Sequence, residues 1–299
     1  NTLQDVWKSC YEAIVRNANY ALENIPECPG LSDAERKQLM GEAYLFRAMN
    51  YFYLVKMFGP VPIINNSYSS VENLYIPRSS EKLVYELILS DLNEALNSGM
   101  PNKPMWENGF RVTHACAEAL MADVCLNMTG YPVNNVTKYA DAAKYAKALI
   151  DNPNFALIQH KDKEDNSAYN ILRTSDTERE YIYCKEFDKT ISTGDWKPVW
   201  VFPNEGATWG EFTYSITGTP YNPVDILHAA YDKENDLRYQ EHQYFHSTYT
   251  QVKGDNAGTV RDLGGKQPYF WWEPEAALNT NTSEKDLVHY RLAEMYLIA

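Results

Sequence analysis

Apolar residues recur at helical spacing through the first half of the chain. In residues 3–25 they are Val6, Cys10, Ala13, Ile14, Ala18, Ala21 and Ile25. Residues three and four apart lie on the same side of an α-helix, so this segment is predicted to be an amphipathic helix. Pro26, Pro29 and Gly30 are expected to end it.

Residues 32–58 are predicted to form a second helix that is buried on several sides. Ser32 and Glu35 have the spacing of a capping box at its start. Its C-terminal part has few clearly polar residues, namely Arg47, Asn50 and Lys56. A helix that is apolar nearly all round must be covered by neighbours, which places it inside a helical stack. Gly59 and Pro60 then stop the helix.

Three further helices are predicted before residue 152. They begin near Ser80, after Thr113 and near Tyr139, and they end near residues 98, 130 and 151. Ala-rich and aromatic-rich helices alternate, a pattern that resembles tetratricopeptide pairing without its strict consensus. We therefore expect a mostly α fold in which residues 1–151 form a scaffold of stacked helical hairpins.

Residues 152–283 have a different character. Trp, Tyr, Gly, Pro, Asn and Thr are dense in this irregular segment, and only residues 223–232 indicate a short helix. Helical periodicity returns at residue 286, so residues 284–299 are expected to begin a C-terminal scaffold helix that pairs with the helix near 139–151. Long irregular insertions are commonly functional, so we expect ligand recognition in residues 152–283.

Two segments resemble the signature motifs of the SusD/RagB-like family. The first motif is E-A-x-(F/L)-(L/F)-R-A-x-x-Y-F-x-L-V-x-x-F-G-x-V-P, matched here by Glu42, Ala43, Leu45, Phe46, Arg47, Ala48, Tyr51, Phe52, Leu54, Val55, Phe58, Gly59, Val61 and Pro62. The second is the R-x-A-E-x-x-L-x-x-A-E-A helix, to which residues 290–299 (YRLAEMYLIA) are similar. The two motifs occur in the family's order.

The resemblance implies the same stacked-hairpin architecture and a role at the cell surface. Proteins of this family are outer-membrane lipoproteins of Bacteroidota-type bacteria that bind glycan, or sometimes peptide, and act as a lid on a SusC-like TonB-dependent transporter. The family's lipid-anchoring cysteine and early N-terminal segment are not in this sequence, which also stops inside the second motif. We therefore expect a longer, lipid-anchored full-length protein. The family's ligand residues are not fixed by motifs, so none is carried over.

Composition and charge exclude some functions. The formal net charge is −13, which argues against a nucleic-acid partner because phosphate binding needs clustered Lys and Arg. No run of 18 apolar residues occurs, so no membrane-spanning helix is predicted. The five cysteines lack a C-x-x-C pair, and we interpret them as small buried side chains, with a Cys10–Cys28 disulfide left open.

Aromatic residues are unusually dense in residues 152–283. An exposed aromatic face can stack on the C–H face of a sugar ring, although most rings are expected to pack in the core. Trp196 and Trp209 are the preferred platforms because Gly and acidic residues surround them. The wider predicted ligand site adds Tyr214, Trp271, Asp195 and Asn204. Trp200, in the run PVWVF, is predicted to be a buried strand residue.

Other constellations carry weaker signals. In an extended segment, adjacent Trp271 and Trp272 would point to opposite faces, one packed and the other exposed. His242 and His246 have zinc-ligand spacing for a helix, but Gln243 replaces the metalloprotease Glu and no third ligand follows, so no metal is expected. Acidic residues between positions 162 and 165 lack the glycine of a calcium loop. Three charged residues on apolar helices are expected to pair or cap helices: Glu42, Arg47 and Glu294.

No nucleophile, phosphate-loop or dinucleotide-binding motif occurs. The sequence therefore predicts a non-catalytic protein, without a cofactor, that captures oligosaccharide and delivers it to a partner transporter. Two alternatives remain open. One is a helical-repeat adaptor that grips peptide in a concave groove. The other is a glycan-degrading enzyme, whose carboxylate pair cannot be recognised among 40 acidic residues.

Overall fold

The computed structural model describes residues 2–67, 75–159, 167–188, 190, 194–202, 209–212 and 223–299. The chain divides into two compact units. Unit one comprises Asn1–Leu157, Arg179–Tyr183 and His289–Ala299. Unit two comprises Ile158–Glu178 and Cys184–Val288.

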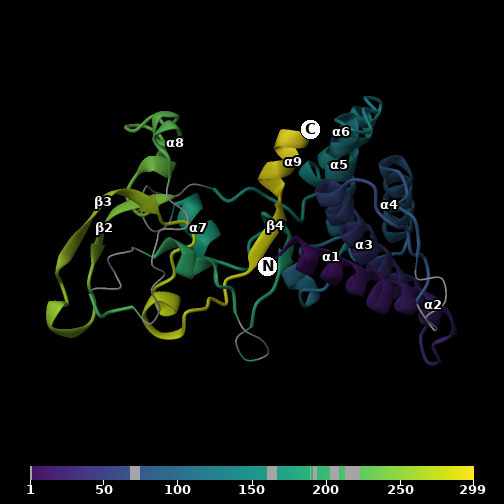
Figure 1. The fold of residues 1–299 in the computed structure, drawn as a ribbon, viewed down its shortest axis with the longest axis horizontal. Helices are drawn as coiled ribbons and strands as arrows, with labels where there is room; N and C mark the ends of the chain where they lie inside the picture. Colours follow the sequence, from purple (N-terminus) through teal and green to yellow (C-terminus); the bar gives the residue numbers. More distant parts are fainter. Residues whose placement is uncertain are drawn as a thin grey trace. The chain divides into compact units, whose positions relative to one another are not determined.

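Unit one is a stack of α-helices (Figure 1). Its helices are α1 (Leu3–Tyr11), the π-helix η1 (Glu12–Asn19), α2 (Tyr20–Asn24), η2 (Ile25–Glu27), α3 (Asp33–Phe58), α4 (Glu81–Leu96), η3 (Met105–Asn108), α5 (His114–Thr129), α6 (Lys138–Ile150) and α9 (Leu292–Ile298). Helix α3 packs on α4, α4 on α5, α5 on α6 and α6 on α9. The mostly α, stacked architecture is therefore confirmed.

The ends of α3 follow the chemistry that the sequence indicates. The Ser32 hydroxyl accepts a hydrogen bond from the Glu35 backbone N–H, and the Glu35 carboxylate accepts one from the Ser32 backbone N–H at 2.9 Å. These two bonds satisfy donors that a helix start leaves open. At the other end Gly59 has φ +66°, a conformation that residues with a Cβ rarely adopt, so the helix stops there.

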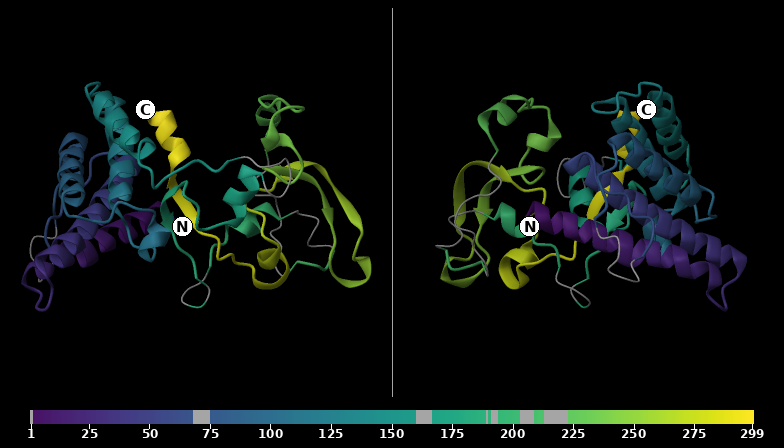
Figure 2. Two further views of the ribbon diagram at one scale, coloured as in Figure 1. Left: turned by 180° about the vertical axis from the view of Figure 1, so that it is seen from behind. Right: turned by 45° about the vertical axis from the view of Figure 1, so that its right-hand side comes forward.

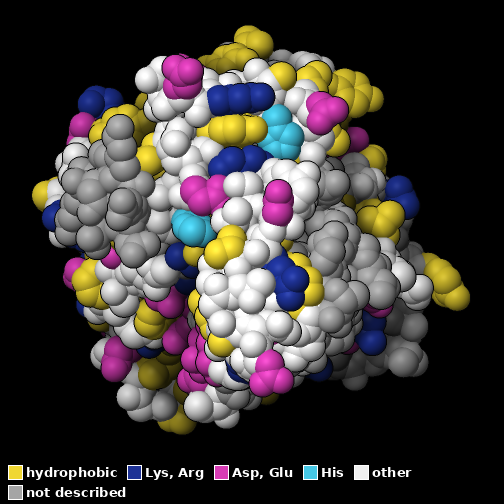
Figure 3. Space-filling view, turned by 90° about the vertical axis from the view of Figure 1, so that its left-hand side faces the viewer, with side chains coloured by type: hydrophobic (Ala, Val, Ile, Leu, Met, Phe, Trp, Pro, Cys, Tyr) yellow, Lys and Arg dark blue, Asp and Glu magenta, His cyan; other side chains and the backbone are white. Residues whose placement is uncertain are grey.

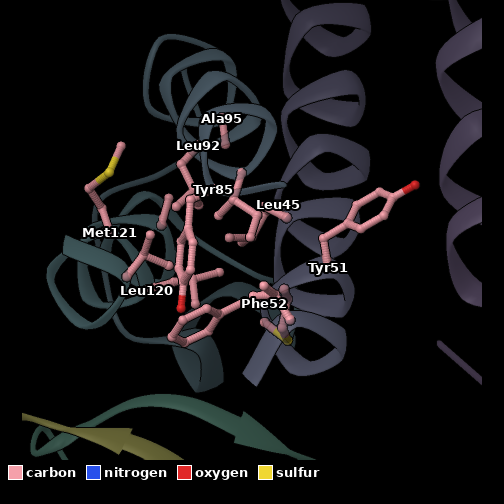
Figure 4. Packing of buried hydrophobic residues seen from close by; sticks show 14 of the residues in the cluster. Leu45, Tyr51, Phe52, Tyr85, Leu92, Ala95, Leu120 and Met121 are labelled. Carbon is pink, nitrogen blue, oxygen red and sulfur yellow. The ribbon is translucent and has the colours of Figure 1, made fainter. Parts of the chain in front are cut away.

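The main core of unit one lies between α3, α4 and α5 (Figure 4). Its fully buried side chains include Leu45, Tyr51 and Leu54 of α3, together with Ile88, Leu92 and Leu120. Figure 4 shows Tyr51 and Leu45 extending from opposite sides of α3, so both sides of the helix are covered. The burial is not complete around the helix, because three large side chains are exposed: Phe46, Tyr53 and Met57.

A buried polar network joins the N-terminal helices to α4. The Arg47 guanidinium donates two hydrogen bonds to the Asp91 carboxylate, at 2.8 and 2.7 Å, and a third to Asn19 Oδ1 at 2.9 Å. The Asn19 amide in turn donates to the backbone oxygens of Ile64 and Asn66 at 2.9 and 3.0 Å. The expectation of a structural ion pair at Arg47 is confirmed, and its partner is Asp91.

The other two charged residues, Glu42 and Glu294, differ from each other in their surroundings. The Glu42 carboxylate pairs with Arg111 at 2.7 Å, so it also forms a structural ion pair. Glu294 is half-buried, and burial together with the nearby negative charge of Asp123 raises the pKa of its carboxyl. Helix α9 therefore carries a carboxyl that is harder to ionise than an exposed one.

A two-stranded sheet of β1 (Tyr181–Lys185) and β4 (Leu287–Arg291) precedes α9. The backbone N–H of Leu292 donates to the Glu180 carbonyl at 2.8 Å, where the strand changes into the helix. The prediction of a helix from residue 284 is therefore wrong before Leu292, because residues 287–291 pair with β1 as a strand. The predicted pairing with α6 is confirmed for α9. Residues 179–183 thus lie in unit one, inside the range predicted as insertion.

Unit two is less irregular than predicted. It contains α7 (Ala168–Thr174), η4 (Lys197–Val201), α8 (Asp225–Ala229), η6 (Leu237–Tyr239), β2 (Phe245–Thr250), η7 (Gly254–Asn256), β3 (Val260–Pro268) and the π-helix η8 (Ala276–Thr280). Strands β2 and β3 form an antiparallel hairpin, visible as a long ribbon in Figure 2, in which Tyr249 lies opposite Arg261. Tyr249 of β2 and Leu263 of β3 supply part of the core of unit two.

None of the five cysteines, all of which lie in the described ranges, forms a disulfide. Cys10, Cys116, Cys125 and Cys184 are buried, as expected for small apolar side chains, but Cys28 is exposed. A Cys10–Cys28 disulfide is not formed, since Cys10 belongs to the core and Cys28 lies in the exposed turn after η2. Within the described part of the chain, no helix is both long and apolar enough to cross a membrane.

Candidate functional site

The short 3-10 helix η4 presents two exposed tryptophans in unit two. Trp196, its N-cap residue, is 46% exposed and Trp200 is 41% exposed. Pro198, Val199 and Val201 are buried, so the helix is anchored through its apolar side chains. Both indoles are therefore carried by a fixed backbone while much of each ring surface remains accessible.

The prediction of a buried strand at Trp200 is wrong. Pro198 is the second residue of a 3-10 helix, in which successive side chains are about 120° apart. Because Pro198, Val199 and Val201 are buried, the Trp200 side chain points outward. The run PVWVF has the apolar composition of a strand, but the proline at its start favours a turn of helix.

Asp195 holds the segment that leads into η4. Its carboxylate accepts hydrogen bonds from the Lys197 ammonium at 3.0 Å and the Lys197 backbone N–H at 3.2 Å. The backbones of Asp195 and Ser283 exchange two hydrogen bonds of 2.8 Å. A Cβ on Gly194 would lie 2.4 Å from the Ser283 carbonyl oxygen, so only glycine fits beside this bridge. Asp195 therefore lies next to Trp196 as predicted, in a position set by these bonds.

Trp209 lies at the edge of the core of unit two. Its indole stacks on the Tyr249 ring, with centroids 5.7 Å apart and planes 7° from parallel, and the Arg261 guanidinium lies 5.6 Å from its centroid. Tyr249 and Arg261 are cross-strand neighbours in the hairpin, so they support the same indole. Trp209 is thus partly buried and fixed, whereas the two tryptophans of η4 are more exposed.

Glu211 is a buried anchor that the sequence pattern does not distinguish from other acidic residues. One carboxylate oxygen accepts hydrogen bonds from the Tyr249 hydroxyl at 3.0 Å and from the backbone N–H groups of Val252 and Lys253 at 2.5 and 3.1 Å. Burial and the neighbouring Glu211 raise the pKa of Tyr249. Glu211 therefore fixes the ring that supports Trp209.

Of the adjacent Trp271 and Trp272, one is packed and the other is exposed, as predicted. They lie at a turn and not on an extended segment, because the Trp272 backbone N–H donates to the Tyr269 carbonyl at 2.8 Å. Trp272 is 5% exposed and packs in the core with Phe202, whereas Trp271 is 39% exposed. The Arg173 guanidinium donates to the Trp272 carbonyl at 2.8 Å, which holds the backbone on the C-terminal side of Trp272. Trp271 is thus a third accessible indole of unit two.

Two predicted ligand residues, Tyr214 and Asn204, lie outside the described residues, as do the acidic residues between positions 162 and 165. The predicted site is therefore described at Trp196, Trp209, Trp271 and Asp195. Trp209 packs in the same core cluster as Val199 and Phe202, which lie at η4, so this cluster supports both predicted platforms.

The histidine pair does not have the geometry of a helical zinc motif. His242 has φ +59° in a turn, and His246 lies in β2, where it is buried. Burial lowers the pKa of His246 to about 4, so this imidazole is neutral at physiological pH. Among the residues described, no group of three or more His, Cys, Asp or Glu side chains could hold a metal ion.

The face of unit two that carries α8 and the hairpin mixes basic, acidic and hydrophobic side chains (Figure 3). Lys233 and Lys266 lie 5.9 and 5.6 Å from the Tyr239 ring centroid, and Arg238 lies 5.2 Å from that of Tyr231. Arg238 and Lys266 also pair with Asp236 and Glu241. Protein cations thus cover these tyrosine rings, which makes them weaker candidates for stacking than the indoles of η4.

The N-terminal part of the chain matches a known protein family. A family model, SusD-like_3, described as "Starch-binding associating with outer membrane", matches residues 1–126. A SusD-like protein of Bacteroides ovatus is 27% identical over 180 residues, which are 57% of this chain and 32% of that protein. The match therefore spans about a third of the length of this curated relative.

Solved structures share the fold over the whole chain. A SusD superfamily protein from Parabacteroides distasonis aligns with a TM-score of 0.87 and 27% identity, over 100% of this chain and 62% of its own. Surface glycan-binding protein A from Bacteroides thetaiotaomicron, solved in complex with laminarihexaose, aligns with a TM-score of 0.71 and 18% identity, over 98% of this chain and 63% of its own. The chain is therefore similar to the SusD/RagB-like family in sequence over residues 1–126 and in fold over its whole length.

Proposed function

We propose that this chain binds glycan through unit two and does not alter it chemically. The observation that carries the proposal is the pair of exposed indoles, Trp196 and Trp200, on the anchored helix η4. Tryptophan is highly buried on average, so two exposed indoles on one short helix are unusual in a folded protein. An indole face is apolar and electron-rich, and it stacks on the weakly positive C–H face of a sugar ring.

The surroundings of the two indoles suit a neutral, hydroxyl-rich ligand. The Asp195 carboxylate and the Lys197 ammonium lie beside Trp196, and each carboxylate oxygen can accept a further hydrogen bond from a sugar hydroxyl. Trp209 and Trp271 are the further platforms in this proposal, and Tyr214 and Asn204 complete the predicted set. The relative solved with laminarihexaose supports the ligand class, because it has the same fold.

We further propose a role for the whole protein at the cell surface. The family description, "Starch-binding associating with outer membrane", and the surface glycan-binding relative support a place at the outer membrane, exposed to the outside. A lipid anchor and the absence of catalysis are further parts of this proposal. The bound oligosaccharide would then pass to a SusC-like TonB-dependent transporter. Co-purification of a tagged full-length protein with an outer-membrane transporter from its own host tests this part, and recovery of the protein alone after gentle solubilisation would count against it.

Calorimetry with a panel of oligosaccharides tests glycan binding directly. We expect Trp196→Ala and Trp200→Ala each to weaken binding about tenfold, because an exposed stacking ring contributes about 1–3 kcal/mol by analogy with base stacking. Tyr131→Ala, which removes an exposed ring from unit one, is the matched control and is expected to bind normally. Unchanged affinity in a Trp196/Trp200 double variant, with its fold intact, would place the site elsewhere.

Prolonged incubation of the protein with a bound oligosaccharide tests the absence of catalysis. We expect mass analysis to recover the ligand unchanged. Product that increases in proportion to protein, and that persists after repeated purification, would instead indicate a glycan-degrading enzyme.

A further inference from the structure

Four points of the chain connect the two units, at residues 157/158, 178/179, 183/184 and 288/289. Within unit two, residues beside three of these points are joined to one another by hydrogen bonds. They are Asp176, Phe187, Lys285 and Asp286, named here the Asp286 clasp. The clasp therefore holds together three segments that are far apart in the sequence.

The three hydrogen bonds that join the residues of the clasp to one another each have a carboxylate oxygen as the acceptor. Asp286 Oδ1 accepts a hydrogen bond from the Phe187 backbone N–H at 3.1 Å. Asp176 Oδ1 accepts one from the Asp286 backbone N–H at 3.0 Å, and it also accepts from the Lys285 ammonium. The Lys285 ammonium donates in addition to the Ser175 carbonyl at 2.6 Å. Two carboxylates are thus brought together, while the single ammonium is bound to Asp176.

Asp286 is the less compensated of the two carboxylates. It is 6% exposed, and its second oxygen is buried with no hydrogen-bond partner among the described residues. The charged groups that face it are Asp176 and Glu186, which are negative, and Lys285, which is positive. Burial, with the two negative neighbours, raises the pKa of Asp286 from its ordinary 3.8 to about 6, against the lowering effects of the Phe187 N–H and of Lys285.

We propose that the Asp286 clasp is a pH-responsive fastening of unit two, tight when Asp286 carries a proton and looser when it is ionised. Protonation leaves the acceptor for Phe187 N–H and the bond from Asp286 N–H to Asp176 in place, since neither requires charge on Asp286. It removes the repulsion from Asp176 and Glu186 and the penalty of a buried charge. Acid therefore stabilises the clasp, whereas it weakens an interaction in which a carboxylate is held by an ion pair.

The direction of the pH dependence follows from the raised pKa. A group that binds its proton more tightly in the folded state stabilises that state at low pH, and the stabilisation is lost as pH rises. For Asp286 the loss runs from about pH 4 to about pH 6 and is complete above that. A pKa difference of about two units corresponds to about a hundredfold change in the equilibrium between closed and open clasp.

Hydrogen exchange of the Phe187 and Asp286 amides measures the opening of the clasp, because both amides donate within it. In the unaltered protein we expect their protection factors, corrected for intrinsic exchange, to fall tenfold to a hundredfold between pH 4.5 and 7.5. Asp286→Asn keeps the side-chain volume and an acceptor oxygen without a charge. We expect this variant to retain strong protection at neutral pH with little pH dependence.

Two further variants make the result decisive. Asp255→Asn removes an exposed carboxylate of unit two outside the clasp, and we expect the normal pH profile. Asp176→Asn removes one negative neighbour but keeps the acceptor oxygen, and we expect the midpoint of the profile to move to lower pH. Protection that is flat or rises with pH in the unaltered protein would overturn the proposal, whether or not the Asp286 variant folds. The same profile in Asp286→Asn as in the unaltered protein would also overturn it.

Discussion

Removal of the Asp91 carboxylate tests how much the buried network of unit one contributes to stability. Asp91 is 2% exposed and receives two hydrogen bonds from Arg47, which is also buried. In Asp91→Ala the guanidinium keeps its bond to Asn19 but loses its counter-charge. Breaking a buried pair by removing one partner costs about 3–5 kcal/mol, because the remaining charge stays out of water. That loss is a large part of the stability of a typical domain, which is about 5–15 kcal/mol.

Circular dichroism at 222 nm, followed during thermal and urea unfolding, reports the helices of unit one. We expect Asp91→Ala to lower the unfolding midpoint by about 10 °C or more, since about 1 kcal/mol corresponds to a few degrees in a domain of this size. The exposed pair of Lys147 and Asp151 on α6 provides the matched control. We expect Asp151→Ala to cost less than about 0.5 kcal/mol, as is usual for exposed helical pairs.

Two further variants separate charge from volume at the same position. Asp91→Asn keeps the shape and one acceptor, so we expect an intermediate loss. A double variant, Arg47→Met with Asp91→Leu, removes both charges and is expected to recover much of the stability lost in Asp91→Ala. Equal small effects of Asp91→Ala and Asp151→Ala would refute the reasoning, because burial would then make no difference to the pair.

Three other substitutions give predictions from separate parts of the structure. Leu54→Asp places a charge at a fully buried position of α3 and is expected to unfold unit one, which loss of the helical dichroism would show. Gly194→Ala is expected to weaken unit two and disturb η4, because its Cβ would clash with the Ser283 carbonyl. Tryptophan fluorescence and thermal melting would detect this effect. A normal melting midpoint would mean that the backbone bridge between Asp195 and Ser283 shifts easily. Trp209→Ala is expected to lower stability by about 2 kcal/mol, because its ring packs on the core, whereas Trp196→Ala should leave the melting midpoint nearly unchanged. Equal melting midpoints for the two tryptophan variants would contradict this difference in burial.

Local chemistry in the sequence was sufficient to predict the scaffold helices. The capping box of Ser32 and Glu35 and the stop at Gly59 mark the ends of α3 because both act within a few residues of the chain. The apolar face of residues 3–25 predicts the first helical segment, although it does not reveal that η1 is a π-helix. The pairing of α6 with α9 could be predicted because α6 is the last scaffold helix before residues 152–283 and helical periodicity returns after them.

Features set by distant partners could not be predicted in this way. Residues 287–291 become a strand because β1 offers them an edge, and the two strands lie about a hundred residues apart in the chain. The exposure of Trp200 depends on the path of a five-residue helix that has a proline as its second residue. The role of Glu211 depends on the backbone of Val252 and Lys253, which the hairpin places beside it. The sequence therefore indicated Trp196 as an exposed ring, whereas the exposure of Trp200 could be identified only from the structure.

Unit one is built from three separate stretches of the chain, and this affects the order in which it folds. Helices α1 to α6 contact neighbours that are close in the sequence, so this part of the stack can form rapidly and while later residues are still being synthesised. Helix α9 and strand β4 reach the same unit only after all of unit two has left the ribosome. Until then the faces of α6 and β1 that they will cover remain open. Slow synthesis or misfolding of unit two would therefore prolong a stage in which a nearly complete helical stack exposes apolar surface to chaperones and to other nascent chains.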